Sequence, residues 1–478
     1  MSWSAVDSLA NQGITFLVGL VLANLLSPSE YGLIGMITIF ISISNTIVDS
    51  GISNAIIRKP DASKEDFSTA FIINVVLGVL MYTVLFFCSP LISSFFHEGK
   101  LISITRVIGI VVIINSFSIV QKTKLEIDID FKRQAKISVI SSVTSGVIGI
   151  LLALLDFGVW ALVAQQISRQ MINAIGLWVT TSWLPSLRFS KESFKYQFDF
   201  GWKLLVSQLI NTIWNQSSNI VIGRCYSSVV LGQFSRAHQF SDLPSSHMTS
   251  IIQRVSFPVL SNIQDNRERL KANYRNLIMT SMFISFVGML ALAACSKSLI
   301  FVLIGEKWEQ AATFLPILCL NFMLYPVRAI NTNMLKVVGR SDKILILEII
   351  KKSIAVGPLL LGVFVSIYWM LWANVFVGVI GYVLNSYFSG KYIKYSTWQQ
   401  FVDILPSFLF GVAVAVIMFF VTFLHLSSLW TLLIQILVGI SLIIFLGELS
   451  KIYPYIELKG LVLSMFDKQN KAVPKQRN

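Results

Sequence analysis

Charged residues are scarce in this sequence. Asp, Glu, Lys and Arg together form 13% of its 478 residues, whereas hydrophobic residues form 55%. Soluble domains carry charge on about a quarter of their residues, so this composition excludes a soluble globular protein. Apolar runs of about 20 residues, the length that crosses a hydrocarbon core, recur along nearly the whole chain. Because a backbone in lipid must satisfy its own hydrogen bonds, these runs predict an all-α, polytopic membrane protein.

Features of catalysis and of metal binding are also few. The four cysteines lie in separate apolar runs without the paired spacing of a metal site, which favours plain packing and predicts no metal centre. No GxxxxGK[ST] phosphate loop occurs, so the sequence predicts no ATP motor. No loop between the runs exceeds about 20 residues, which leaves no room for a folded catalytic domain. We therefore predict no enzyme and no cofactor, and transport driven by a gradient or by a partner.

The apolar runs predict about fourteen membrane-spanning helices. Short turns near 156–158, 365–369 and 426–428 leave open that neighbouring runs merge or re-enter the membrane, which would lower this number. The predicted spans are 3–26, 31–51, 70–90, 101–121, 136–155, 158–182, 201–223, 229–257, 275–295, 310–335, 342–366, 367–390, 401–425 and 429–449.

The distribution of Lys and Arg predicts the orientation. If the N-terminus is cytoplasmic, the cytoplasmic loops and the tail hold about 26 Lys and Arg, and the external loops hold about four. The external ones are Lys100, Arg224, Lys297 and Lys307. Cytoplasmic loops carry an excess of positive charge, so both ends are predicted to be cytoplasmic. This asymmetry also accounts for most of the net charge of +14, so no nucleic-acid partner is predicted.

A weak internal repeat relates the stretches 2–32 and 201–232. Both place a Trp before an apolar helix dotted with polar residues, then a short turn and a Gly. Six predicted spans separate the two starts, so both copies enter the membrane in the same direction. Two parallel six-helix lobes of this kind enclose a central cavity. The predicted domains are a lobe at 1–195, a lobe at 196–395, two extra helices at 396–450 and a basic cytoplasmic tail at 451–478.

Six cations interrupt the predicted spans. Each costs about 3 kcal/mol at a helix centre, and the sum of about 15–20 kcal/mol exceeds a typical total stability. These side chains must therefore snorkel, pair, or line water. Glu348 can pair with Lys351 or Lys352 on one helix face, and Arg106 lies near a span end. The surplus of cations predicts an anionic guest in a wet cavity, with structural pairing as the alternative. The candidate substrate-binding residues are Arg106, Arg169, Arg236, Arg328, Lys351 and Lys352.

The predicted span 229–257 contains a candidate ion-coupling pair. His238 and Asp242 are four residues apart, hence on one helix face, and both groups can change charge when partly buried. They are a candidate relay for H⁺ or Na⁺, and an internal salt link from Asp242 to Arg236 is the alternative. Pro244 would kink the helix and is a candidate hinge.

Several segments resemble one family. They are LANLLSPSEYGLIGM in the first two spans, FGVWALVAQQI in the sixth, and LGQFSRAHQFSDLPSSHMTSIIQRVSFPVLS in the eighth. The chain resembles bacterial polysaccharide flippases of the O-antigen and colanic-acid exporter branch, Wzx-like members of the multidrug/oligosaccharidyl-lipid/polysaccharide exporter superfamily. The resemblance implies fourteen helices in two lobes in the bacterial cytoplasmic membrane. It makes Arg236 a family-typical residue, whereas Asp242 stands where relatives carry small or neutral residues.

The resemblance further implies a substrate. This is an undecaprenyl-pyrophosphate-linked oligosaccharide, a repeat unit of surface polysaccharide, moved from the inner to the outer leaflet by alternating access. Membrane lipid, a polysaccharide polymerase and glycosyltransferases are the implied partners. The alternatives are a glycan polymerase or ligase acting on the same carrier, a scaffold, and an exporter of cationic drugs, although the last requires an acidic cavity. Asn211, Trp214, Asn215 and Gln216 are candidate glycan contacts, with helix packing as the alternative.

Overall fold

The protein is helical throughout the described part of the chain. The computed structural model describes residues 2–186 and 188–471, which form α-helices, two short 3₁₀ segments and connecting turns, without a β-strand. The all-α prediction is therefore confirmed. The chain forms two compact units, Met1–Ser235 and Arg236–Asn478, and each is described separately below.

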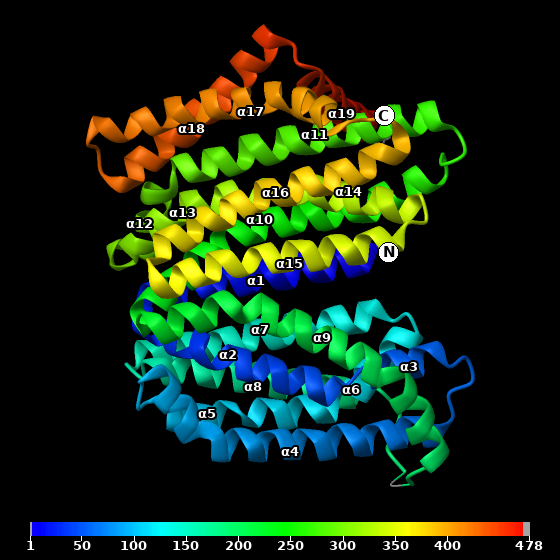
Figure 1. Ribbon diagram of the computed structural model, residues 1–478. Helices are drawn as coiled ribbons and strands as arrows, with labels where there is room; N and C mark the ends of the chain where they lie inside the picture. Colours follow the sequence, from blue (N-terminus) through cyan, green and yellow to red (C-terminus); the bar gives the residue numbers. More distant parts are fainter. Residues whose placement is uncertain (1, 187, 472–478) are drawn as a thin grey trace, which may run out of the picture. The chain divides into compact units, whose positions relative to one another are not determined.

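The first unit contains nine helices and the beginning of a tenth (Figure 1). Helix α7 packs between α1 and α8, α4 packs along α5 and α6, and α2 packs against α4 and α9. The helices are α1 (Ser2–Leu25), α2 (Pro28–Asp49), α3 (Ile52–Arg58), α4 (Lys64–Phe96), α5 (Leu101–Ile108), α6 (Ile110–Ile127), α7 (Phe131–Leu154), α8 (Val159–Thr180), α9 (Lys191–Cys225) and α10 (Ser228–Ser261), of which α10 continues into the second unit.

The second unit contains the remaining helices. Helix α11 packs along α17, α15 pairs with α16, and α13 contacts α11, α12 and α16. The elements are α11 (Arg267–Ala294), α12 (Ser296–Ile304), η1 (Glu306–Trp308), α13 (Glu309–Phe322), α14 (Tyr325–Val337), α15 (Ser341–Phe364), α16 (Ile367–Ile393), α17 (Thr397–Phe420), η2 (Val421–Leu424), α18 (Ser428–Ser450) and α19 (Tyr453–Lys471). Helix α19 lies in the segment that the sequence predicts only as a basic tail.

Local sequence signals set the helix ends. The backbone N–H of Ser27 donates to the Glu30 carboxylate at 2.6 Å, and Pro28 occupies the first turn of α2. Ser50 and Gly51 then adopt left-handed conformations, with φ of 41° and 68°, which separates α2 from α3. At the start of α17, the Ser396 backbone N–H donates to the Gln399 side chain at 3.1 Å, and the Ser396 hydroxyl accepts from the Gln399 N–H at 3.2 Å. Turns also separate the three helix pairs whose merging the sequence leaves open.

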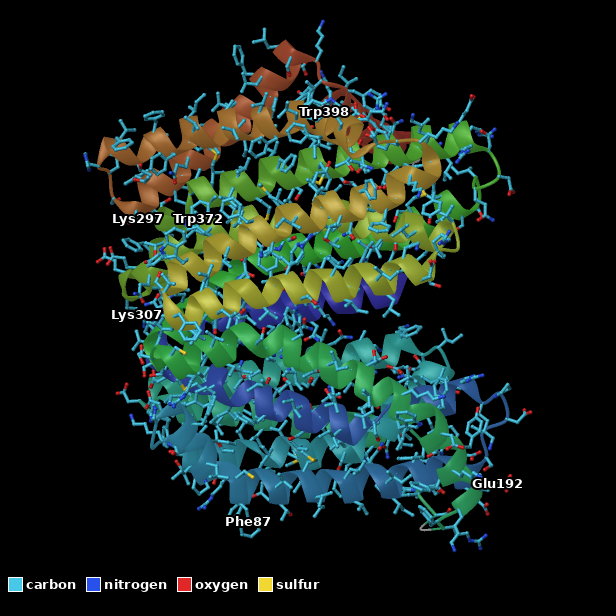
Figure 2. The ribbon with its side chains drawn as sticks, viewed as in Figure 1. Phe87, Glu192, Lys297, Lys307, Trp372 and Trp398 are labelled. Atoms are coloured by element: carbon cyan, nitrogen blue, oxygen red, sulfur yellow. The ribbon has the colours of Figure 1, made fainter. Side chains whose placement is uncertain are left out.

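The helices agree with the predicted spans, each of which overlaps one helix or two consecutive helices. Within the described residues, nine helical segments are long and apolar enough to cross a membrane, so the total of about fourteen spans stays a prediction. Their outer surfaces are apolar, as illustrated by Phe87 on α4, which points away from the first unit and is 73% exposed (Figure 2). The protein is thus a multi-pass membrane protein.

The helices outside this set of nine include those that carry predicted site residues. Helix α8 carries Arg169, α10 carries Arg236, and α15 carries Lys351. Their polar side chains lower the mean hydropathy, or raise the number of charged residues, in every stretch of these helices that is long enough to span a membrane. The other two arginines, Arg106 and Arg328, lie within the nine apolar segments.

Helix α17 is joined to α11 by both apolar and ionic contacts. Phe283 on α11 packs against Phe410 on α17, with ring centroids 5.2 Å apart. Near the other end, the Arg275 guanidinium donates two hydrogen bonds to the Asp403 carboxylate at 2.5 and 2.6 Å, and the Tyr395 hydroxyl donates a third at 2.5 Å. The side chain of Asp403 is only 11% exposed. The carboxylate therefore holds three donors at the junction of these helices.

Asp403→Asn is expected to loosen this junction. The amide loses the charge that binds the guanidinium, at a cost of about 1–3 kcal/mol in the free energy of unfolding. A lowered Tm of the purified protein in detergent measures the effect, with the loop substitution Asp265→Asn as the control. An Asn variant that melts at the wild-type temperature would contradict the assigned role.

Candidate functional site

The six predicted cations are divided between the two units. Arg106 on α5 and Arg169 on α8 lie in the first unit, and the other four lie in the second. Arg236 is on α10, Arg328 on α14, and Lys351 and Lys352 on α15. A cavity shared by all six stays a prediction.

The structure brings Arg328 and Lys351 together against the bare backbone of α16. A Cβ atom built on Gly381 would lie 3.6 Å from Cδ of Arg328 and 3.7 Å from Cδ of Lys351. Lys351 Nζ also donates to Glu348 Oε1 at 2.5 Å. We call Arg328, Glu348 and Lys351 the basic cluster. With two cations and one carboxylate, the cluster keeps a net positive charge.

A series of aromatic contacts connects α10 with the basic cluster. The rings of His238 and Phe322 meet edge to face at 5.1 Å, and Phe322 packs on Tyr325 at 4.6 Å. The Arg328 guanidinium then lies 4.1 Å from the centroid of the Tyr325 ring. An Arg over an aromatic face gains cation–π stabilisation and is oriented by it, so the guanidinium fork is held in place.

Lys351 of the basic cluster lies deep along α15. Lys351 is ten residues after the first residue of α15 and thirteen before the last. At 1.5 Å per residue, this is about 15 Å from the nearer helix end, half the thickness of a hydrocarbon core. Its side chain is 20% exposed, so it is neither sealed in nor at a surface. A cation at this depth requires a local partner, water or a guest.

Arg169 is bound by a neutral group in the first unit. Its Nη2 donates to Asn11 Oδ1 on α1 at 3.0 Å, and the Ser142 hydroxyl donates to the same oxygen. An amide oxygen orients the guanidinium but does not neutralise it. Asn11 thus orients the Arg169 guanidinium, and the role of Arg169 as a substrate contact stays a prediction.

A row of amides crosses the first unit beside Arg169. Gln170 on α8 donates to Asn115 on α6 at 2.9 Å, and Asn115 donates to Asn45 on α2 at 3.0 Å. The sequence does not predict this row. The only sign of the row in the sequence is the presence of Asn and Gln within apolar helices.

Arg106 has a different environment. Its Nε donates to Ser89 Oγ on α4 at 3.0 Å, and its guanidinium lies 4.4 Å from the centroid of the Phe86 ring. A hydroxyl and a ring face together explain how this cation is retained, which favours the structural alternative for Arg106.

The predicted coupling residues lie on α10. Arg236 Nη1 donates to Gln239 Oε1 at 2.5 Å, and Asp242 is half-buried. Helix α10 continues through Pro244, and the next residue, Ser245, donates to the Phe322 carbonyl at 2.8 Å. The ion relay and the hinge stay predictions.

The predicted glycan contacts lie on α9. Asn211 and Asn215 are exposed and one turn apart, whereas Gln216 accepts a hydrogen bond from Asn219 at 2.7 Å.

The first turns of α2 and α10 touch through two glycines. A Cβ atom on Gly32 would lie 1.7 Å from the Ser228 carbonyl oxygen, and one on Gly232 would lie 1.8 Å from that of Pro28. The hydroxyls of Ser29 and Ser228 are 3.1 Å apart. We call Pro28, Ser29, Gly32, Ser228 and Gly232 the glycine contact. Only glycine permits backbones to approach this closely.

Comparison with known proteins places the chain in a family. The sequence model of a family described as "Polysaccharide biosynthesis protein" matches residues 21–313, well over half of the chain. The chain belongs to this family. The family resemblance predicted from the sequence is thereby confirmed.

Individual relatives match nearly the full length of this family member. The teichuronic acid biosynthesis protein TuaB of Bacillus subtilis (strain 168) is 26% identical over 471 residues, which are 96% of each chain. The lipopolysaccharide biosynthesis protein WzxC of Escherichia coli (strain K12) is 24% identical over 432 residues, 87% of each chain.

Solved structures extend the comparison to the fold. The lipid II flippase MurJ in an inward closed conformation superimposes with a TM-score of 0.75 at 13% identity, covering 94% of this chain and 99% of MurJ. At this identity the likeness concerns the fold alone.

Proposed function

We propose that this protein is a flippase that moves an undecaprenyl-pyrophosphate-linked oligosaccharide from the inner to the outer leaflet of the bacterial cytoplasmic membrane. The glycan and the pyrophosphate cannot cross hydrocarbon unaided, whereas the polyprenyl chain can remain in it. The protein would bind the polar head group and expose it to each side in turn.

The observation that carries the proposal is the basic cluster. Arg328 and Lys351 lie side by side against Gly381, and Lys351 pairs with the Glu348 carboxylate. An Arg fork and a Lys point charge both suit phosphate oxygens. Family membership in polysaccharide biosynthesis supports a phosphate-linked sugar as the anion. In the first unit, Arg169 offers a further cation, which Asn11 orients.

The charge of the loops supports an orientation in the membrane, and the family supports functional partners. The excess of Lys and Arg in alternate loops supports cytoplasmic N- and C-termini. Lys297 and Lys307, two of the few basic residues predicted to be external, lie at the same end of the second unit (Figure 2). Glycosyltransferases that build the repeat unit and a polymerase that consumes it are the proposed functional partners.

A transport assay in vesicles tests the proposed function. Purified protein is reconstituted with a fluorescent polyprenyl-pyrophosphate-linked oligosaccharide, and the fraction reached by a membrane-impermeant quencher is followed over time. Protein-dependent transfer of an unchanged molecule supports a flippase. Lengthening of the glycan would instead indicate a polymerase, and the absence of transfer would refute the proposal.

Coupling to an ion gradient is proposed to involve His238 and Asp242. Asp242→Asn fixes this carboxyl in a neutral form, so transport should lose its dependence on an imposed H⁺ or Na⁺ gradient. The rate with the gradient should fall to the rate without it. The measurement compares both rates in vesicles, with Asp265→Asn in an exposed turn as the control. A variant that still responds fully to either gradient would exclude Asp242 as the coupling group.

A further inference from the structure

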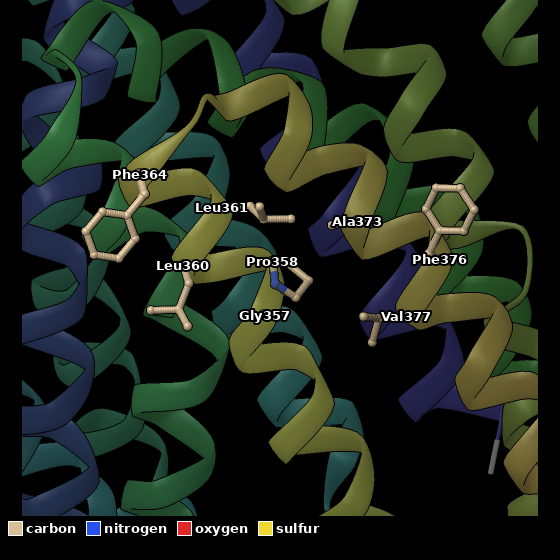
Figure 3. Close-up of a pocket in the computed structure, with 8 residues that line it drawn as sticks. All are labelled: Gly357, Pro358, Leu360, Leu361, Phe364, Ala373, Phe376 and Val377. Carbon is tan, nitrogen blue, oxygen red and sulfur yellow. The ribbon is translucent and has the colours of Figure 1, made fainter.

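A fully apolar groove runs between α15 and α16. It has a volume of about 510 Å³, within the range of sites that hold small ligands. Pro358 and Leu361 on α15 face Ala373 and Val377 on α16 across it (Figure 3). Gly357, Leu360, Phe364 and Phe376 complete its lining. Phe364 and Phe376 are 79% and 67% exposed, and their rings lie on opposite sides in Figure 3.

The groove and the basic cluster are in register on both helices. On α15, Lys351 precedes Pro358 by seven residues, which is two helical turns and therefore the same face. On α16, Val377 precedes Gly381 by four residues, again on one face. Gly381 is the point at which Arg328 and Lys351 meet α16. Along the helix axes, Pro358 therefore lies about 10 Å from Lys351, and Val377 lies about 6 Å from Gly381.

We propose that this groove binds the polyisoprenyl chain of a phosphate-bearing lipid while Arg328 and Lys351 bind its phosphates. The inference rests on the proposed function and adds a tail site to it. An apolar lining complements a hydrocarbon chain, and the cations complement the charge at its end. The protein would thereby recognise the carrier lipid itself in addition to the sugar.

The depth of the cations separates this ligand from an ordinary phospholipid. A phospholipid keeps its phosphate in the interfacial region, outside the roughly 30 Å hydrocarbon core. Lys351 lies about 15 Å from the nearer end of α15, near the middle of that core. Only a lipid whose phosphates have left the interface can fill the groove and reach the basic cluster together. A lipid in transit between leaflets meets this condition.

Photo-crosslinking on the full-length protein in nanodiscs tests the site. The probe is a sugar-free polyprenyl pyrophosphate with a diazirine on its isoprenoid chain. Labelling is expected in peptides that contain the groove residues of α15 and α16. Unlabelled polyprenyl pyrophosphate should compete at least tenfold better than the corresponding polyprenol or phosphatidylglycerol. Equal competition by phosphatidylglycerol would reveal an ordinary acyl-chain site and overturn the proposal, as would labelling confined to other helices.

Bulky substitutions give the matched comparison. Ala373→Trp fills the groove from α16, and Leu361→Trp fills it from α15. Each should reduce labelling at least tenfold. Val379→Trp, at an exposed position of α16 outside the groove, should leave it unchanged. Wild-type labelling in both groove variants would contradict the tail site, and having two variants guards against misfolding of one.

The vesicle assay separates failure of this inference from failure of the proposed function. If the wild-type protein transfers the glycan-linked lipid and both groove variants transfer it equally fast, the tail site is wrong and the flippase function stands. If the wild-type protein transfers nothing, the proposed function itself fails, whatever the probe labels.

Discussion

Lys351→Gln is expected to slow transport of the lipid-linked glycan by about 10- to 100-fold. The substitution removes one charged hydrogen-bond donor to the pyrophosphate, worth about 1.5–3 kcal/mol, and each 1.4 kcal/mol is a factor of ten. It also lowers the net charge of the basic cluster from +1 to 0, because Glu348 remains. The initial rate of head-group exposure in vesicles measures the effect.

Glu348→Gln, one turn away, should act in the opposite direction. This change removes the carboxylate that competes with the substrate for Lys351, so the rate should stay at or above that of the wild-type protein. Lys343→Gln, near the start of α15, is the matched control for loss of a lysine, since Lys343 pairs with Asp342 far from the cluster. If both Gln substitutions at 348 and 351 slow transport equally, the cluster supports structure and does not bind the anion.

A disulfide across the glycine contact is expected to abolish transport. The hydroxyls of Ser29 and Ser228 are 3.1 Å apart, so cysteines at these positions should couple on oxidation. We expect the first turns of α2 and α10 to separate in one state of the proposed alternating-access cycle, and a covalent link would prevent this. Transport by Ser29→Cys/Ser228→Cys should fall at least tenfold on oxidation and return on reduction. The vesicle assay with and without reductant measures both steps.

Native cysteines near the engineered pair could form competing disulfides in this test. Cys225 is exposed and three residues from Ser228, so Cys225→Ser should be present in all variants. Each single cysteine variant should be insensitive to oxidant. A complete disulfide that leaves the transport rate unchanged would show that the glycine contact does not open during the cycle.

The sequence predicts helices well because lipid leaves the backbone no alternative. Every predicted span overlaps helices of the structure, and the turns at Asp156, Val365 and Ser427 separate helices as their polar or short connections suggest. The tail is different. Helix α19 packs on α11, and the Thr280 hydroxyl donates to Glu457 at 2.5 Å. These two residues are 177 positions apart, so the local sequence does not predict the contact.

The candidate site was predicted residue by residue but not as an arrangement. Intramembrane charge identifies Arg169, yet its partner Asn11 is 158 residues away and amide side chains are common in helix packing. Hydropathy likewise marks Arg328 and Lys351 separately. That they meet at Gly381 depends on how α14, α15 and α16 pack, and a glycine in an apolar run has too little local signal to reveal it.

The helices that fall outside the apolar set have a consequence for biogenesis. A helix is released into the bilayer when its residues favour lipid, and a central Arg, Lys or Asp opposes this by about 2.5–3.5 kcal/mol. Helix α10 carries Arg236, His238 and Asp242, so it inserts poorly by itself. We expect α10 to be stabilised only after α13 emerges, because His238 and Ser245 of α10 both contact Phe322 of α13. The polar residues proposed for transport thereby impose an order on membrane assembly.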